Sequence, residues 1–280
     1  MMIKDITHWK VNDELMASGT REKYWVICPN TRENYLFKLP KENTGEIWAE
    51  KIAAEIGKSI GLNMMTVEIA IYNNQTGLLL RNFSSKTNEF FDGGDLIKRN
   101  IIDFQINDLT DYTLDNVMNA IAPFRLEQGI LSTLVFDALI ANQDRHCENW
   151  GIIFESSDDI KMSPIFDNGA SLGYSNSVDQ IDKMLRDSRM FEAFTNRSKS
   201  IIGLPEKKRP KLREFLLELK KNYPEFIKSE LKRIERLNPV AVENILETIP
   251  ETVMSNTYKK WVFRLLFYRK TWIFDLLKES

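Results

Sequence analysis

The spacing of apolar residues changes near residue 84, and this change limits the folds open to the chain. Before it, short aromatic and β-branched runs alternate with turn-forming residues, which predicts antiparallel strands. These runs cover 24–27, 35–37, 67–72 and 78–80. One segment with helical spacing, 47–60, lies among them, and Gly61 follows it as a helix end signal.

Beyond residue 84 helical spacing dominates. The pattern predicts a buried helix over 125–141, a hairpin from 151 to 165 around the polar residues 155–159, and further helices from Leu212 onward. We therefore expect an α+β, two-lobed chain, with a small β-rich lobe over 1–84 and a larger, mainly helical lobe over 85–280. The boundary is expected in the polar stretch 84–94. A cleft between two lobes is a common place for a ligand.

Composition narrows the class of protein. Hydrophobic residues make up 43% of the chain, enough for a sizeable core, and the net charge of -2 gives no sign of direct nucleic-acid binding. The two cysteines, Cys28 and Cys147, lack CxxC spacing, which favours a reducing compartment. We find no signal-like N-terminus and no long uncharged apolar run, so we expect a soluble cytoplasmic protein that does not bind a membrane.

Three oxygen-bearing side chains lie on the connections around the predicted hairpin. Asp144 and Asn149 are five residues apart between the buried helix and the hairpin, and Asp167 follows Asn149 by eighteen residues. Magnesium takes oxygen ligands and keeps several waters, so one carboxylate and one amide oxygen suffice from the protein. Phosphoryl transfer also needs a carboxylate to orient the attacking hydroxyl. We predict Asp144 as that base, with Asn149 and Asp167 as metal ligands.

The first lobe supplies matching nucleotide contacts. Lys38 interrupts an apolar strand and needs a counter-charge, for which a triphosphate oxygen and Glu50 of the following helix are the predicted partners. The segment 18–23 offers free backbone amides for phosphates. The remaining predicted cofactor contacts complete this set: Ser18, Gly19, Thr20, Leu80 and Asn82.

Each of these residues also has an ordinary structural interpretation. Loop Asp and Asn residues often cap helices or form turns, and a strand lysine can protect a sheet edge. Glu50 also fits a solvated helix face. His146 beside Cys147 is neither a zinc site nor a convincing thiol nucleophile, and we expect His146 to stabilise its loop. The lysine-rich stretch 206–236 fits a solvated face or a basic docking surface for a partner.

The ordered set of motifs resembles the HipA-type serine/threonine kinases. The resemblance covers most of the chain, is strongest over 142–169 and is weak over 84–125 and 175–240. The matching residues are 18–23, 36–38, Glu50 within 49–62, 142–149, 164–167 and 250–278.

The resemblance implies a two-lobed protein-kinase-like fold that uses ATP with Mg²⁺ to phosphorylate serine or threonine in a protein substrate. It also implies a possible toxin role with an antitoxin protein as partner. The chain starts almost at the nucleotide loop, so we expect a catalytic domain without the family's N-terminal subdomain. Met16 stands where some members carry a self-phosphorylated serine, which leaves Ser18 and Thr20 as acceptor candidates.

Two other functions remain open from the residues alone. A small-molecule kinase of the aminoglycoside-phosphotransferase type shares the Asp-x4-Asn arrangement. A nucleotide-binding pseudokinase regulator would act by protein contact, although every expected acid is present here. The first choice remains a protein serine/threonine kinase.

Overall fold

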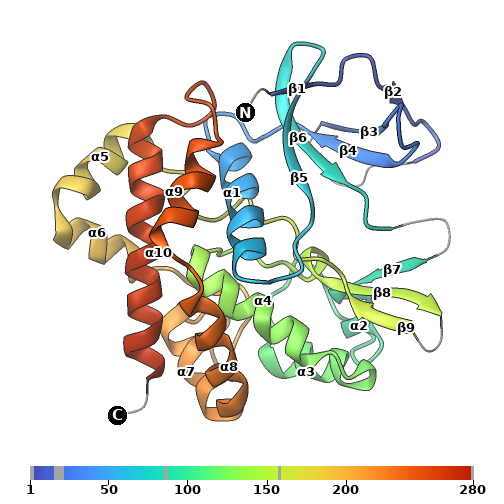
Figure 1. The fold of residues 1–280 in the computed structure, drawn as a ribbon. Helices are drawn as coiled ribbons and strands as arrows, with labels where there is room; N and C mark the ends of the chain where they lie inside the picture. The colour runs from blue at the N-terminus through green and yellow to red at the C-terminus, as the bar shows by residue number, and fades with distance from the viewer. Residues whose placement is uncertain (1–2, 16–21, 85–87, 157–158, 279–280) are drawn as a thin grey trace.

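The computed structural model describes residues 3–15, 22–84, 88–156 and 159–278 of the 280-residue chain. Strands gather on one side of the molecule and helices on the other (Figure 1). This mixed α+β arrangement confirms the predicted fold class, with a sheet formed from the first 81 residues and a mainly helical part beyond it.

The larger sheet has six strands in the order β1-β5-β6-β4-β3-β2. Neighbouring strands are antiparallel except for the parallel pair β1 and β5. The strand bounds are β1 Lys4–Asp5, β2 Lys10–Val11, β3 Lys23–Ile27, β4 Asn34–Lys38, β5 Val67–Tyr72 and β6 Gln75–Arg81.

Tight turns set the register of this sheet. Asn73 and Asn74 both have positive φ, 48° and 64°, as a two-residue type I′ hairpin turn requires, so β5 pairs with β6 from Tyr72 and Gln75 onward. The sequence pattern extended this turn to Gly77. Gly77 instead lies inside β6, where a Cβ atom would come within 2.6 Å of the Phe37 ring. The glycine therefore serves close packing and not the turn.

The two faces of the sheet have different roles. On one face Phe37, Ala70 and Leu79 pack against Ile6 and Trp9. The opposite face of the sheet packs against α1 (Glu46–Ser59). This helix lies between β5 and α9 (Figure 1). Because side chains alternate along a strand, Lys38 of β4 lies on the face opposite that of Phe37.

A second sheet contains β7 (Glu89–Asp92), β8 (Gly151–Ser156) and β9 (Asp159–Met162), in that order. The β8–β9 hairpin confirms the sequence prediction, whereas β7 was assigned to a polar boundary segment. That assignment missed a strand because polar residues flank its apolar pair. Gly151 permits the pairing, since a Cβ atom there would lie 2.2 Å from the Phe91 carbonyl oxygen.

The helical part is built around α4, which is buried on nearly all sides and contacts α7, α8 and α10. The long α10 contacts α4 and lies between α9 and the pair α5 and α6 (Figure 1). Among the described residues, no helix combines the length and the apolar character needed to cross a membrane. The helix bounds are α2 Gly93–Lys98, α3 Leu114–Ile121, α4 Glu127–Ile140, α5 Val178–Arg186, α6 Ser188–Thr195, α7 Leu212–Asn222, α8 Pro224–Glu235, α9 Pro239–Glu247 and α10 Asn256–Leu277, with short 3-10 turns at Ala122–Phe124 and Cys147–Asn149.

Candidate active site

The loop after α4, residues 142–150, holds Asp144 at the protein surface. The α4 helix ends at Ala141 in the left-handed region, with φ of 55°. Asn142 is buried, donates to Asp137 Oδ1 over 2.9 Å and accepts from the Asp144 amide over 3.2 Å. These bonds fix the start of the loop, and the Asp144 side chain remains exposed. An accessible carboxylate at this position suits the predicted base.

Asn149 lies close to Asp144 in the same loop. Its Nδ2 donates to the Asp144 carbonyl oxygen over 3.1 Å, and its backbone amide donates to the His146 carbonyl oxygen over 2.9 Å. Because Nδ2 is used in this bond, Oδ1 is the side-chain atom left to bind a cation. The His146 backbone amide also donates to the Asp144 carbonyl oxygen, over 2.8 Å, a bond that does not depend on the imidazole.

Arg145 joins the 142–150 loop to the loop after β9, residues 163–169. Its guanidinium is buried and binds both carboxylate oxygens of Asp137, over 2.9 and 2.7 Å. Its NH1 donates to the carbonyl oxygens of Asn149, over 3.0 Å, and Phe166, over 2.6 Å, and its NH2 donates to Asn168 Oδ1 over 2.7 Å. One side chain thus fixes the spacing of the two loops that carry the predicted metal ligands. The sequence prediction assigned Arg145 no role.

Asp167 is held between Arg145 and Lys38. Its neighbours Phe166 and Asn168 both accept bonds from Arg145, and its own Oδ1 lies 3.0 Å from Lys38 Nζ. The Asp167 backbone has φ of 54°, a left-handed conformation that non-glycine residues seldom adopt and that often occurs at functional sites. The Asp167 side chain keeps 40% of its surface exposed, so its carboxylate is accessible to a ligand.

Lys38 forms ion pairs with two carboxylates. Its Nζ lies 3.0 Å from Glu46 Oε1 and 3.0 Å from Asp167 Oδ1, and its side chain is 14% exposed. Burial by itself would lower the pKa of Lys38. The negative charges of Asp167, Glu46 and Glu50 raise it by a larger amount, so the pKa lies above its ordinary value. Lys38 therefore remains a cation that can bind a phosphate oxygen.

The helix partner of Lys38 differs from the predicted one. The ion pair belongs to Glu46 in the first turn of α1, where the sequence prediction chose Glu50. Glu50 lies one turn later, is buried, and accepts from Asn168 Nδ2 over 3.3 Å. Burial, with Asp167 nearby, raises the pKa of Glu50 to about 7. Gly169 makes room for Glu46, because a Cβ atom there would lie 2.6 Å from Glu46 Cγ.

Leu80 lies on the same face of the sheet as Lys38. The β4–β6 register pairs Lys38 with Leu78 and Leu36 with Leu80, which places all four side chains toward α1. Leu80 packs in one apolar cluster with Phe83 and Phe166. An apolar surface therefore extends from the strand lysine to the residue before Asp167.

Asn82 follows β6 at the edge of an open cavity. Its backbone amide donates to the Asn34 carbonyl oxygen over 3.2 Å, and its Oδ1 accepts from the Ser84 amide over 2.9 Å. The cavity has a volume of about 850 Å³, and of the predicted site residues that the structure describes, Asn82 alone lines it. Its lining residues are 11–15, Ile27, Arg32, Asn34, Asn82 and Ser84. The predicted contacts Ser18, Gly19 and Thr20, with Met16, lie outside the described residues.

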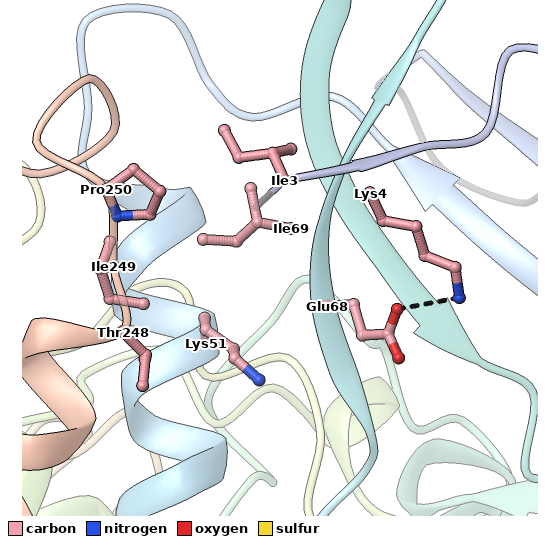
Figure 2. A pocket seen from close by; sticks show the side chains of 8 residues that line it. All are labelled: Ile3, Lys4, Lys51, Glu68, Ile69, Thr248, Ile249 and Pro250. Carbon is pink, nitrogen blue, oxygen red and sulfur yellow. Dashed lines mark hydrogen bonds and ion pairs between the residues drawn. The ribbon is translucent and has the colours of Figure 1, made fainter. Parts of the chain in front are cut away.

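A second, much smaller cavity has no part in this site. Its volume is about 30 Å³, roughly that of one water molecule, and none of the predicted site residues lines it. Figure 2 shows it between Ile3, Ile69 of β5, Lys51 of α1 and the segment that follows α9. The Lys4–Glu68 ion pair of 3.2 Å lies at its side.

The side chains present fit a magnesium-nucleotide site better than a transition-metal site. Within the described ranges, no group of three or more His, Cys, Asp or Glu side chains could hold a metal ion. Mg²⁺ needs fewer protein ligands, because waters and phosphate oxygens complete its octahedron. Asn149 Oδ1 and the Asp167 carboxylate are the oxygens that would hold the ion. Burial raises the pKa of the Cys147 thiol to about 12, which disfavours a thiolate role.

One protein that is similar along nearly the whole chain is a kinase. The chain is 26% identical over 289 aligned residues to the serine/threonine-protein kinase CtkA of Helicobacter pylori, covering 97% of this chain and 86% of CtkA. The crystal structure of the H. pylori proinflammatory kinase CtkA matches with a TM-score of 0.85 at 24% identity, over 99% of this chain and 97% of that one. This relative and this fold support a kinase-type phosphotransferase.

The HipA proteins are more distant in structure. HipA of Shewanella oneidensis MR-1, solved with HipB and its operator DNA, matches with a TM-score of 0.59 at 14% identity, over 95% of this chain and 67% of that one. The model of the family named HipA-like C-terminal domain matches residues 15–227, which is most of the sequence. On this match, the chain belongs to the family of HipA-like C-terminal domains.

Proposed function

We propose that the protein is an ATP- and Mg²⁺-dependent serine/threonine protein kinase. The observation that carries the proposal is the convergence on Asp167 of Lys38, 3.0 Å away, and of Arg145, which binds the residues on both sides of Asp167. The strand lysine, the 142–150 loop and the 163–169 loop thereby meet at one point, as phosphoryl transfer from a metal-bound nucleotide requires.

Each residue has a proposed role in the transfer. Asp144 accepts the proton of the substrate hydroxyl as its oxygen attacks the γ-phosphorus, and the bond from that phosphorus to the β–γ bridging oxygen breaks. Lys38 binds a phosphate oxygen of ATP, and Leu80 and Asn82 border the adenine ring of ATP. Asn149 and Asp167 would hold Mg²⁺, which when bound offsets the charge of the phosphates. Positioning of the reactants and stabilisation of the phosphate charge supply most of the rate enhancement over the uncatalysed reaction.

Two alternatives are less well supported. A small-molecule phosphotransferase fits the Asp144–Asn149 spacing but not the relation to a protein kinase along nearly the whole chain. The loss of a key acid would favour a pseudokinase regulator, whereas Asp144 and Asp167 are both present. We further propose a cytoplasmic location, where ATP is available, and a toxin role with an antitoxin as partner, by analogy with the HipA–HipB pair.

The test uses radiolabelled ATP with MgCl₂, with and without a cell lysate. Asp144→Asn should still bind ATP but lose about 10²- to 10⁴-fold in phosphate transfer, the usual contribution of a general base. Asp167→Asn should also lose Mg²⁺-dependent nucleotide binding, and asparagine tolerates the left-handed backbone there. Asp275→Asn, at an exposed position on α10, is the matched control and should behave as wild type.

The location of the label decides between the functions. Label on a protein supports the protein kinase, and label only on a small molecule supports the alternative phosphotransferase. Tight ATP binding without transfer to any acceptor would support the regulator. Full transfer activity in either the Asp144 or the Asp167 variant would contradict the role given to that residue.

A further inference from the structure

The segment 196–213, which contains the link between α6 and α7 and the first two residues of α7, contacts the residue before Asp144. The Lys199 backbone amide donates to Gln143 Oε1 over 3.0 Å, and Gln143 directly precedes Asp144. Both Gln143 and Asp144 are exposed. A peptide that brings its hydroxyl to Asp144 therefore has this segment as a neighbour.

Two lysines of the segment lie directly opposite each other. Lys199 and Lys211 form an antiparallel bridge. The bonds from Ser200 to Pro210 and from Leu212 to Ser198 make it a non-hydrogen-bonded pair, the type in which side chains are closer. Like charges directly opposite each other destabilise a strand pair. Both side chains are exposed, so an anion that binds between them would relieve this repulsion.

The segment has a net positive charge, and Glu214, which directly follows it, accepts from the Lys211 backbone amide over 2.9 Å. Residues 196–213 contain seven basic side chains and one acidic side chain. Lys207 pairs with Glu214 over 2.7 Å and Lys208 with Asp108 over 3.6 Å. The basic residues for which the structure shows no ion pair within the described ranges are Arg197, Lys199, Arg209, Lys211 and Arg213.

The segment is anchored to the body of the protein. The Gly203 amide donates to the Tyr112 carbonyl oxygen over 2.8 Å, and the Leu114 amide donates to the Gly203 carbonyl oxygen over 2.9 Å. Ile201 and Ile202 are buried in the core. Tyr112 in turn donates from its hydroxyl to the Arg145 carbonyl oxygen over 2.7 Å. The lysines are thus presented by a preformed backbone tied to the 142–150 loop.

Building on the proposed kinase function, we propose that the segment 196–213 is a substrate-docking surface that selects acidic residues close to the accepting serine or threonine. Lys199 and Lys211 are its centre. Complementary charge at such a surface raises the association rate and disfavours basic partners. The occupant is an acidic stretch of a substrate protein, because the surface lies beside the predicted base where the acceptor hydroxyl must be bound.

The test compares three fluorescein-labelled serine peptides that differ only at the flanking positions, which are Asp, Asn or Lys. Binding is measured by fluorescence anisotropy without ATP, and transfer is measured separately with ATP and Mg²⁺. The variants are Lys199→Glu, Lys211→Glu and the double substitution. Lys260→Glu, at an exposed position on α10, is the matched control.

Wild type and the control should bind the Asp peptide at least about ten-fold more tightly than the Asn peptide, a difference of about 1.4 kcal/mol. Each single variant should lose most of this preference, and the double variant should prefer the Lys peptide. The KM for ATP should stay unchanged. Equal binding of the Asp and Asn peptides by wild type, or unaltered preference in the double variant, overturns the proposal.

The same experiment separates this inference from the kinase assignment. Charge-selective binding without phosphorylation of any peptide would mean that the kinase proposal fails while the docking surface stands. Phosphorylation of all three peptides with equal KM would mean the reverse. A further outcome is that wild type binds an RNA oligonucleotide more tightly than it binds the Asp peptide, with the RNA binding lost in the double variant. That result would reassign the surface to nucleic acid and overturn the acidic-peptide proposal.

Discussion

Lys38 Nζ lies 3.0 Å from Glu46 Oε1, so the strand lysine forms its helix ion pair with the first turn of α1. Glu50, one turn later, bonds to Asn168 instead. The α1 helix therefore contributes two buried carboxylates to the site, and they have different partners. This division of partners makes the two glutamates experimentally separable.

Glu46→Gln should weaken nucleotide binding more than Glu50→Gln does. Loss of the Glu46 charge removes one of the two ion pairs that hold the Lys38 side chain, so the ammonium group is positioned less firmly for a phosphate oxygen. We expect a rise of about ten-fold or more in the KM for ATP with Glu46→Gln and a smaller rise with Glu50→Gln. Steady-state kinetics on both variants gives the comparison, and the reverse order would contradict the ion-pair assignment.

Glu50 should make stability depend on pH in the protein without nucleotide or metal. Burial raises its folded-state pKa from 4.5 to about 7, so its contribution to stability is full below pH 4.5 and is lost as pH rises toward 7. Glu50→Gln removes this loss, on the order of 3 kcal/mol across that window. Urea unfolding of wild type and variant at pH 5 and pH 7.5 measures the difference, and parallel pH profiles would refute it.

Arg145 should matter for stability and, separately, for transfer. Arg145→Ala leaves the buried Asp137 carboxylate unpaired and should cost about 3–5 kcal/mol in the free energy of unfolding. The paired change Arg145→Met with Asp137→Leu removes both charges and should recover much of that loss. Phosphate transfer should stay low, because nothing then bonds the Asn149 and Phe166 carbonyls together.

Denaturation midpoints and single-turnover transfer rates, measured on the same samples, separate these two effects. Recovery of both quantities in the paired variant would show that Arg145 acts through stability alone. Recovery of neither would show that the buried charges cannot be replaced at this position.

Cys147 should be unreactive in the folded protein. Its pKa of about 12 leaves roughly one thiolate in ten thousand at pH 8, and the side chain is 1% exposed. In a Cys28→Ala background, a thiol reagent such as DTNB should modify Cys147 slowly until urea unfolds the chain. Rapid stoichiometric reaction of the native protein would contradict the buried position.

Local sequence patterns predicted most elements of the fold. The runs at 24–27 and 35–37 became β3 and β4, and the helical spacing at 47–60 became α1. One of the elements that the sequence analysis did not predict, β7, has a sequence that does not distinguish it from a polar linker. Its strand state depends on pairing with β8, about sixty residues away, and such pairing leaves little local signal.

The candidate site was predicted unevenly. The sequence identified Lys38, Asp144, Asn149 and Asp167. The structure places Lys38 on β4 and the other three on two loops, which Arg145 joins to each other and Lys38 contacts at Asp167. Their chemical roles stay predictions. Glu46 was missed, although a glutamate in the first turn of the helix after the strand lysine was a usable signal. Arg145 was missed because its partners are mostly backbone carbonyls and buried polar groups.

The sequence alone determined the two-part α+β organisation and the order of the acid, amide and lysine motifs, because helix and strand periods and loop residues act over short distances along the chain. Tertiary structure decided which glutamate meets Lys38, which arginine joins the two loops, and that Lys199 lies beside Gln143. These relations depend on the rotation of α1 and on where distant loops pack. A buried charge takes whichever partner packing brings within reach, and spacing along the chain does not fix that choice.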